Sequence, residues 1–145
     1  MKKNTKGFTL IELLAVIVIL AIIALIATPI VLNLINTARR GAAARSAEGI
    51  RSSLKAQYFA QMAINPEETT EAFTIDFKDS TAETAVAKFG GEKLGNIIDG
   101  KLPTAGEVNI SADGTVTTAA DDKLVIDGYY CSFAATGSAT CTKNS

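Results

Sequence analysis

The chain has 145 residues, of which 14 are basic and 15 acidic, and it contains two cysteines but no histidine and no tryptophan. Once a long apolar segment near the N-terminus is set aside, this length supports one small domain. The lack of histidine excludes Ser-His and Cys-His nucleophile pairs and histidine metal sites, and the sequence has no glycine-rich phosphate loop. We therefore expect no catalytic activity, no cofactor and no metal.

Charge is distributed unevenly along the chain. Residues 39–55 carry five bases and one acid, which gives this stretch a net charge of +4. Residues 65–145, called the head below, carry six lysines and thirteen acids, for a net charge of −7. A nucleic-acid-binding protein usually has its basic surface on the exposed domain, so we expect no nucleic acid at the head.

A short polar leader precedes the apolar segment. Residues 1–7 read M-K-K-N-T-K-G, and their three lysines favour a cytoplasmic N-terminus, although arginines beyond the other end of the segment nearly balance them. Between Leu13 and Leu32 only Thr28 is polar, and a helix of this length spans roughly 30 Å, the thickness of a bilayer's hydrocarbon core. A single membrane-spanning helix is predicted, longer than the ~7–15 apolar residues of a cleaved secretory signal.

The motif K-G-F-T-L-I-E at Lys6–Glu12 is followed by an apolar helix that contains Pro29. This combination resembles the N-terminus of a type IV prepilin, and the resemblance covers only the N-terminal segment. It implies that a prepilin peptidase cuts between Gly7 and Phe8 and methylates the new amine of Phe8. It also implies that Glu12 occupies the position of the family's near-invariant glutamate.

Glu12 is a carboxylate at the edge of an apolar helix. An ionised carboxylate in hydrocarbon costs a few kcal/mol unless it has a partner, lies near the interface or is neutralised. Cleavage after Gly7 creates a positive amine at Phe8, one helical turn from Glu12. We expect Glu12 of one helix to pair with the Phe8 amine of a neighbouring copy and so fix an axial stagger, which the resemblance also implies. The alternative is that Glu12 only reaches the lipid headgroups.

Pro29 interrupts the helical hydrogen bonding, because it has no N–H to donate to the carbonyl of Leu25. Two interpretations are open. The helix can be kinked at this point, or, as family precedent suggests, residues 21–29 partly unwind when the helix packs into a filament and so give the polymer length and elasticity.

From Asn33 onward the helix is predicted to be amphipathic and to end near Ile64, before Asn65-Pro66. Its apolar residues recur at spacings of three and four: Ala43, Ala47, Ile50, Leu54, Tyr58 and Met62. We expect this stripe to pack against the sheet of the head, with a coiled-coil face as the alternative. The basic residues between its members, which include Arg45 and Arg51, are expected to face outward, towards the acidic heads of neighbours or towards solvent.

The head is predicted to be an antiparallel sheet. Phe73–Phe77 alternates apolar and polar residues, as a half-buried strand does. Asp-Gly pairs at 99–100, 113–114 and 127–128 predict tight turns between further strands. Those strands are expected at Glu107–Ala112, Thr115–Ala119, Lys123–Ile126 and Tyr129–Phe133, with a short helix over Ala82–Phe89.

Cys131 and Cys141 enclose nine residues near the C-terminus. In an oxidising compartment they are expected to form a disulfide, which contributes up to ~3 kcal/mol and pins the tail to the head. The resemblance to disulfide-bearing pilins suggests the same, and two free thiols are the alternative. A structural zinc site is disfavoured, because it needs four ligands.

These features predict an α+β protein with a pilin-like fold, in which a long N-terminal helix is packed by an antiparallel head. The expected division is a leader at 1–7, a membrane and filament-core helix at 8–32, its amphipathic continuation at 33–64 and the head at 65–145. The precursor is expected in the plasma (inner) membrane with a cytoplasmic N-terminus, and the mature chain at the cell surface in an extracellular pilus.

We interpret the chain as a structural subunit of a type IV pilus, for which adhesion, motility and aggregation are family roles. Expected partners are further copies of the chain, the prepilin peptidase and methylase, the pilus assembly platform, other pilins, and the membrane before assembly. One alternative is a minor pilin or pseudopilin of a type II secretion or DNA-uptake machine. Another is a membrane-anchored binding domain that never polymerises.

Overall fold

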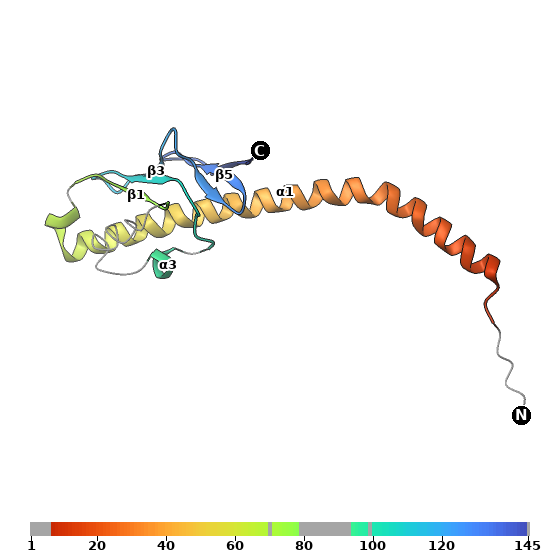
Figure 1. Cartoon of the computed structure of the whole chain (residues 1–145). Coiled ribbons are helices and arrows are strands. Elements are labelled where there is room, and N and C mark those ends of the chain that lie inside the picture. Colours follow the sequence, from red (N-terminus) through yellow and green to blue (C-terminus); the bar gives the residue numbers. More distant parts are fainter. Residues whose placement is uncertain (1–6, 70, 79–93, 99, 145) are drawn as a thin grey trace, which may run out of the picture. The chain divides into compact units, whose positions relative to one another are not determined.

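The computed structural model describes residues 7–69, 71–78, 94–98 and 100–144. The chain forms two units, Met1–Ala38 and Arg39–Ser145. One long helix, α1 (Leu10–Ile64), begins in the first unit and ends in the second (Figure 1). The described part of the second unit adds two short helices and six strands: η1 (Pro66–Thr69, 3₁₀), β1 (Phe73–Asp76), α3 (Leu94–Ile97), β2 (Glu107–Ile110), β3 (Val116–Thr118), β4 (Leu124–Ile126), β5 (Tyr129–Ser132) and β6 (Thr140–Lys143).

The C-terminal end of α1 follows from its local sequence. The helix ends at Ile64, as predicted. The Asn65 N–H still donates a hydrogen bond to the carbonyl of Gln61 (2.7 Å). Pro66 then stops the helix, because its ring disfavours helical geometry in the preceding residue and it has no N–H of its own to donate.

The strands form two antiparallel sheets of three strands each, in the orders β1-β2-β3 and β4-β5-β6. The predicted α+β class is confirmed, but the expected single sheet is two. The segment after β3 folds back onto Glu107, which donates its N–H to the carbonyl of Asp122 and accepts a bond from the Ala119 N–H (both 3.1 Å). Because the chain leaves the first sheet at this point, isolated bonds such as that from the Thr118 N–H to the Phe133 carbonyl (3.1 Å) join the sheets.

Strand β6 is absent from the sequence-based prediction, which treats the residues after Cys131 as a flexible loop and tail. The stretch T-C-T-K has no apolar alternation, and it becomes a strand by pairing with β5, where Cys131 and Cys141 lie opposite each other. The helices η1 and α3, of four residues each, were not predicted either. The helix expected over Ala82–Phe89 lies outside the described residues.

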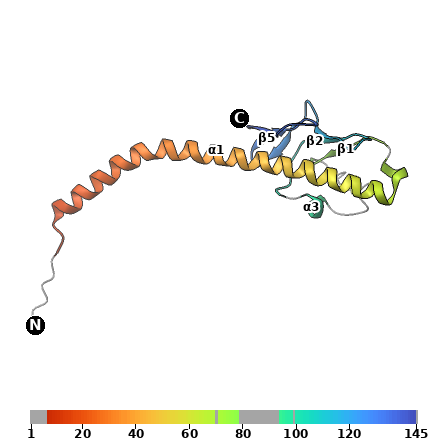
Figure 2. The ribbon, with the colours of Figure 1, turned by 180° about the vertical axis from the view of Figure 1, so that it is seen from behind.

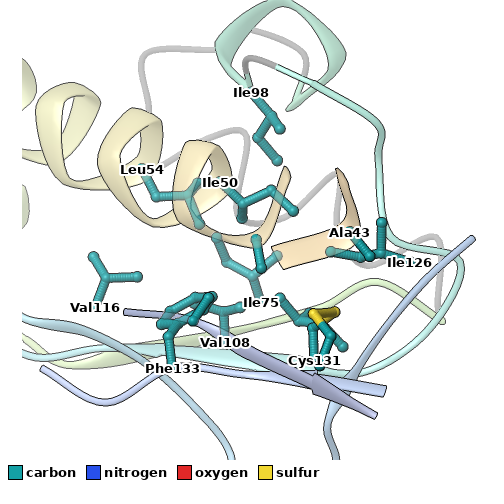
Figure 3. Close-up of a cluster of buried hydrophobic side chains, with 14 of the residues drawn as sticks. Ala43, Ile50, Leu54, Ile75, Ile98, Val108, Val116, Ile126, Cys131 and Phe133 are labelled. Carbon is teal, nitrogen blue, oxygen red and sulfur yellow. A yellow bond between two sulfur atoms is a disulfide. The ribbon is translucent and has the colours of Figure 1, made fainter. Parts of the chain in front are cut away.

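The core of the second unit lies between α1 and the two sheets (Figure 3). The predicted stripe of α1 is confirmed as its packing seam: Ala43, Ala47, Ile50, Leu54 and Tyr58 are buried, and Met62 is partly buried beside them. The strands contribute alternate side chains to the same cluster: Ile75, Val108, Ile110 and Val116 from the first sheet, and Leu124, Ile126 and Cys131 from the second. Both sheets therefore use one face of the helix as their common support.

In Figures 1 and 2 the short helix α3 lies below α1, whereas the strands lie above it. Leu94 in α3 and Ile98 just after it are buried members of the core cluster. Figure 3 shows Ile98 pointing towards α1 near Ile50. This segment therefore covers α1 on a further side near Ile50.

Two of the predicted Asp-Gly turns are confirmed. Asp127 and Gly128 join β4 to β5 with φ of 52° and 81°, and positive φ at both central residues is the geometry of a two-residue type I′ hairpin. The pair Asp113–Gly114 joins β2 to β3, with a φ of 78° at the glycine. Asp99, of the remaining pair, lies outside the described residues.

Candidate functional site

The apolar segment of α1 is exposed along its whole length. Every leucine, isoleucine and valine from Leu10 to Ile35 is solvent-exposed, from 41% at Ile35 to 85% at Leu10. The helix is long and apolar enough to cross a membrane. A signal sequence near an N-terminus meets the same criterion, so the residues at the helix start decide what kind of segment this is.

The first turn of α1 carries a reciprocal pair of hydrogen bonds between Thr9 and Glu12. Both the N–H and the hydroxyl of Thr9 donate to Oε2 of Glu12, at 2.9 and 2.8 Å. The Glu12 N–H in turn donates to the Thr9 hydroxyl (3.4 Å). This is a capping box, in which the N-cap side chain and the third helical residue satisfy each other's backbone N–H.

The sequence predicts a helix that begins at Phe8, whereas α1 begins at Leu10. The capping box explains this difference. Sequence reasoning missed it, although its signal, a threonine followed three residues later by a glutamate before an apolar run, is present at Thr9–Glu12. Among the described residues, the first backbone bond of the helix runs from the Leu13 N–H to the Thr9 carbonyl (3.2 Å). The peptide bond between Gly7 and Phe8 thus lies outside the helix.

Pro29 lies within α1, which is assigned as one helix through it. One residue earlier, the Thr28 hydroxyl donates to the carbonyl of Ala24 (2.6 Å). A hydroxyl bonded to the preceding turn needs no water, so it is compatible with an apolar environment. The unwinding of residues 21–29 in a filament stays a prediction.

The N-terminal segment matches a family of known proteins. Residues 2–28 fit the family model described as the prokaryotic N-terminal methylation motif. The chain carries a prepilin-type N-terminus. No curated protein and no solved structure matches the chain, so its likeness to pilins rests on this motif and on the α+β fold.

The methylation motif identifies the apolar segment as a prepilin signal. The family that carries it is structural and not enzymatic, and the motif implies processing by a prepilin peptidase and assembly into a pilus. The exposed apolar helix that follows fits a membrane-anchored precursor. The protein is pilin-like in its processing signal, in its long N-terminal helix and in the antiparallel sheets packed on that helix.

A second candidate site is the loop between Cys131 and Cys141, which are joined by a disulfide. Two side chains of α1 hold this loop. Oε1 of Glu48 accepts a hydrogen bond from the Ala139 N–H (3.0 Å). Nη1 of Arg51 donates to two loop carbonyls, those of Ala134 (3.2 Å) and Gly137 (2.7 Å).

The contacts of Arg51 correct one expectation. The basic residues between the members of the stripe were expected to face outward, and this is wrong for Arg51. Its guanidinium lies 5.7 Å from the ring centroid of the buried Phe133, in addition to the two loop carbonyls. Arg39, Arg40 and Arg45 are exposed. No local signal marks Arg51, because its partners are 83 and 86 residues away in the sequence.

Replacing Arg51 with methionine is expected to loosen the disulfide loop. Methionine keeps much of the apolar stem but removes both hydrogen bonds, and bonds to a charged donor contribute ~1.5–3 kcal/mol, which we discount to ~1 kcal/mol because the side chain is half-exposed. Hydrogen exchange at residues 134–138 of the full-length chain in detergent should become faster. Arg45→Met is the matched control, since Arg45 is exposed on the same helix; equal exchange in the two variants would contradict the assignment.

Two exposed carboxylates lie at the hairpin turns. Oδ1 and Oδ2 of Asp113 accept bonds from the N–H and the hydroxyl of Thr115 (3.0 and 2.9 Å), and these bonds, the backbone one first, lower the pKa of Asp113. Asp127 forms a hydrogen-bonded ion pair with Lys101 (2.6 Å), which lowers the pKa of Asp127. Both turns therefore favour the ionised form of their aspartate.

These pKa shifts predict acid sensitivity of the second unit. A carboxyl whose folded-state pKa is depressed stabilises the fold above its unfolded pKa, about 3.9 for aspartate, and that stabilisation is lost as the pH falls through the folded-state pKa. The midpoint temperature of thermal unfolding should thus decrease as the pH falls below about 4. Asp113→Asn combined with Asp127→Asn should flatten this dependence, as measured by thermal unfolding across the acid range. An unchanged slope in the double variant would contradict the prediction.

Metal sites and free cysteines would be further sites of chemistry in the described residues. No group of three or more His, Cys, Asp or Glu side chains in the described ranges is placed to hold a metal ion. Both cysteines are in the disulfide. The features that point to a function are thus the prepilin-type N-terminus, the exposed apolar helix and the loop held by Glu48 and Arg51.

Proposed function

We propose that this chain is a structural subunit of a type IV pilus and polymerises through α1 into a surface filament. The observation that carries the proposal is a methylation motif at residues 2–28 joined to a helix whose apolar side chains stay exposed. Burying each such side chain contributes ~1.5–3 kcal/mol. The segment from Leu10 to Ile35 therefore first inserts into a bilayer and afterwards packs in a bundle of like helices.

The precursor is a single-pass protein of the plasma (inner) membrane with a cytoplasmic N-terminus. A prepilin peptidase cuts between Gly7 and Phe8, and the new amine of Phe8 is methylated. The assembly platform and other pilins then receive the mature chain, which has no enzymatic role and binds no nucleic acid at its head. The parts are the leader (1–7), the filament-core helix (8–32), its continuation (33–64) and the head (65–145).

Assembly is directed by charge at the start of the helix. Glu12 of one copy pairs with the Phe8 amine of a neighbour, and in apolar surroundings this attraction is far stronger than in water. The pairing sets the axial stagger between copies. The exposed Arg39, Arg40 and Arg45 are available to the acidic heads of neighbours, which carry the opposite charge.

Among pilins, the charge of the head favours a major subunit over a component of a DNA-uptake machine. The head carries a net charge of −7, and an acidic surface repels the phosphate backbone instead of neutralising it. The methylation motif and the apolar helix are shared by major and minor pilins, so the abundance of the chain in filaments distinguishes the two.

The test is to shear filaments from the cell surface and to identify the dominant subunit by mass spectrometry. We expect this chain to dominate, with its N-terminus at methylated Phe8. If the chain is a trace component of filaments built from another subunit, it is a minor pilin. If it stays in the membrane with Gly7 and Phe8 still joined, it is a membrane-anchored domain and the proposal is wrong.

A further inference from the structure

Glu12 already has a partner within its own chain. Its Oε2 accepts hydrogen bonds from both the N–H and the hydroxyl of Thr9, and its own N–H donates to that hydroxyl. A carboxylate at the edge of an apolar segment must be compensated by donors, because water is scarce there. Thr9 supplies two donors before any neighbouring copy is present.

We propose that Thr9 is a positioning residue for assembly, which acts by holding the Glu12 carboxylate in a fixed orientation on the helix. The inference rests on the proposed function of Glu12 as the partner of a neighbour's Phe8 amine. It adds that pairing with the neighbour's amine depends on two residues of one chain, Thr9 and Glu12. Glu12 carries the charge, and Thr9 orients the carboxylate.

The two carboxylate oxygens of Glu12 can bind different partners. Both Thr9 donors bind Oε2, and among the described residues no hydrogen bond or ion pair uses Oε1. A second copy can therefore approach Oε1 without displacing Thr9. An amine that binds there adds to the capping box, so the helix start stays intact during assembly.

The capping box also fixes the position of the charge along the helix axis. An axial stagger is reproducible only if every copy begins its helix at the same residue, because each residue gained or lost shifts the start by ~1.5 Å. Helix ends otherwise fray. The box instead begins α1 at Leu10, and losing an N-cap of this kind shifts the equilibrium of the first turn by roughly 2- to 30-fold.

The test compares Thr9→Val with Thr9→Ser. Valine has nearly the shape of threonine but lacks the hydroxyl, whereas serine retains it. In the full-length chain in detergent micelles, amide exchange at Glu12 and Leu13 is expected to be roughly 2- to 30-fold faster in Thr9→Val and close to wild type in Thr9→Ser.

The second readout is assembly in cells. At equal amounts of cleaved and methylated subunit in the membrane, Thr9→Val is expected to give several-fold fewer sheared filaments than wild type, and Thr9→Ser a wild-type yield. Equal exchange in the two variants, or faster exchange in Thr9→Val with an unchanged filament yield, would overturn the proposal.

The two proposals fail in different ways. If the wild-type chain is not cleaved and forms no filament, the proposed function is wrong and the assembly role of Thr9 falls with it. If the wild-type chain assembles normally and Thr9→Val assembles as well as Thr9→Ser, the proposed function stands and only the role of Thr9 is overturned.

Discussion

Replacing Glu12 with alanine is expected to abolish filament assembly or to reduce it by at least about tenfold, while the precursor still enters the membrane. The substitution removes the only negative charge of the apolar segment. A charge pair in apolar surroundings is worth a few kcal/mol, and each 1.4 kcal/mol is a factor of ten in an equilibrium. Because every subunit contact in a filament repeats the loss, the effect on the polymer is larger than on one pair.

Glu12→Gln separates the two roles of this residue. Glutamine at the third helical position also forms capping boxes, so the bonds from Thr9 have an acceptor in this variant. Its amide carries no charge and cannot form an ion pair with the Phe8 amine. We expect Glu12→Gln to keep the helix start at Leu10, measured by amide exchange, and still to lose filaments in a shearing assay. Normal filaments in both variants would show that Glu12 only reaches the lipid headgroups.

Gly106→Ala is expected to destabilise the second unit by ~3 kcal/mol or more. Gly106 has a φ of 104°, and a Cβ at this position would lie 2.7 Å from the Cα of Leu124 and closer still to the carbonyl oxygen of Lys123. The unfavourable φ and the backbone clash each cost ~1–3 kcal/mol. Neither neighbour can rotate away, because both contacts are to main-chain atoms.

The matched control for this effect is Gly128→Ala. Gly128 also has a positive φ, 81°, but a Cβ there meets nothing within 4 Å. Only the conformational cost applies, about 1 kcal/mol. Denaturant unfolding of the full-length chain in detergent, followed by the near-ultraviolet signal of its three tyrosines, should separate the two variants. Equal loss of stability in both would mean that the contact at Lys123–Leu124 is not tight.

The large cost at Gly106 reflects its place between the two sheets. Ala105, next to it, forms a bridge with Val125 of β4, and Glu107 begins β2 of the first sheet. The main chain of one sheet therefore approaches that of the other at this residue. Sequence reasoning gives Gly106 no role, since the close approach involves residues 17 and 18 positions away.

Several elements of the fold that have a local sequence signal were predicted. The stripe of α1 shows its period in the sequence because one face of a helix must be apolar to support a core. Asn65-Pro66 predicts the end of the helix because proline cannot continue it. Asp127–Gly128 predicts a hairpin because the turn requires positive φ at both positions. In each case the physical cause lies within a few residues of the signal.

Features that depend on distant partners were not predicted. The sequence pattern predicts that Arg51 faces outward like the other bases of the helix. Only the folded chain brings it to the carbonyls of the disulfide loop. Strand β6 has no apolar alternation and exists because β5 lies beside it. The division into two sheets likewise follows from the fold-back onto Glu107.

The sequence was sufficient to predict the prepilin-type signal and the long apolar helix, because a methylation motif and a run of apolar residues are properties of local composition and length. It also determined the packing seam of α1 and the hairpin turns. The tertiary structure alone decided how the head is built, since strand pairing, the docking of the disulfide loop by Glu48 and Arg51, and the tight contact at Gly106 join residues far apart in the chain. Such contacts arise from the path of the whole backbone, and no short stretch of sequence encodes them.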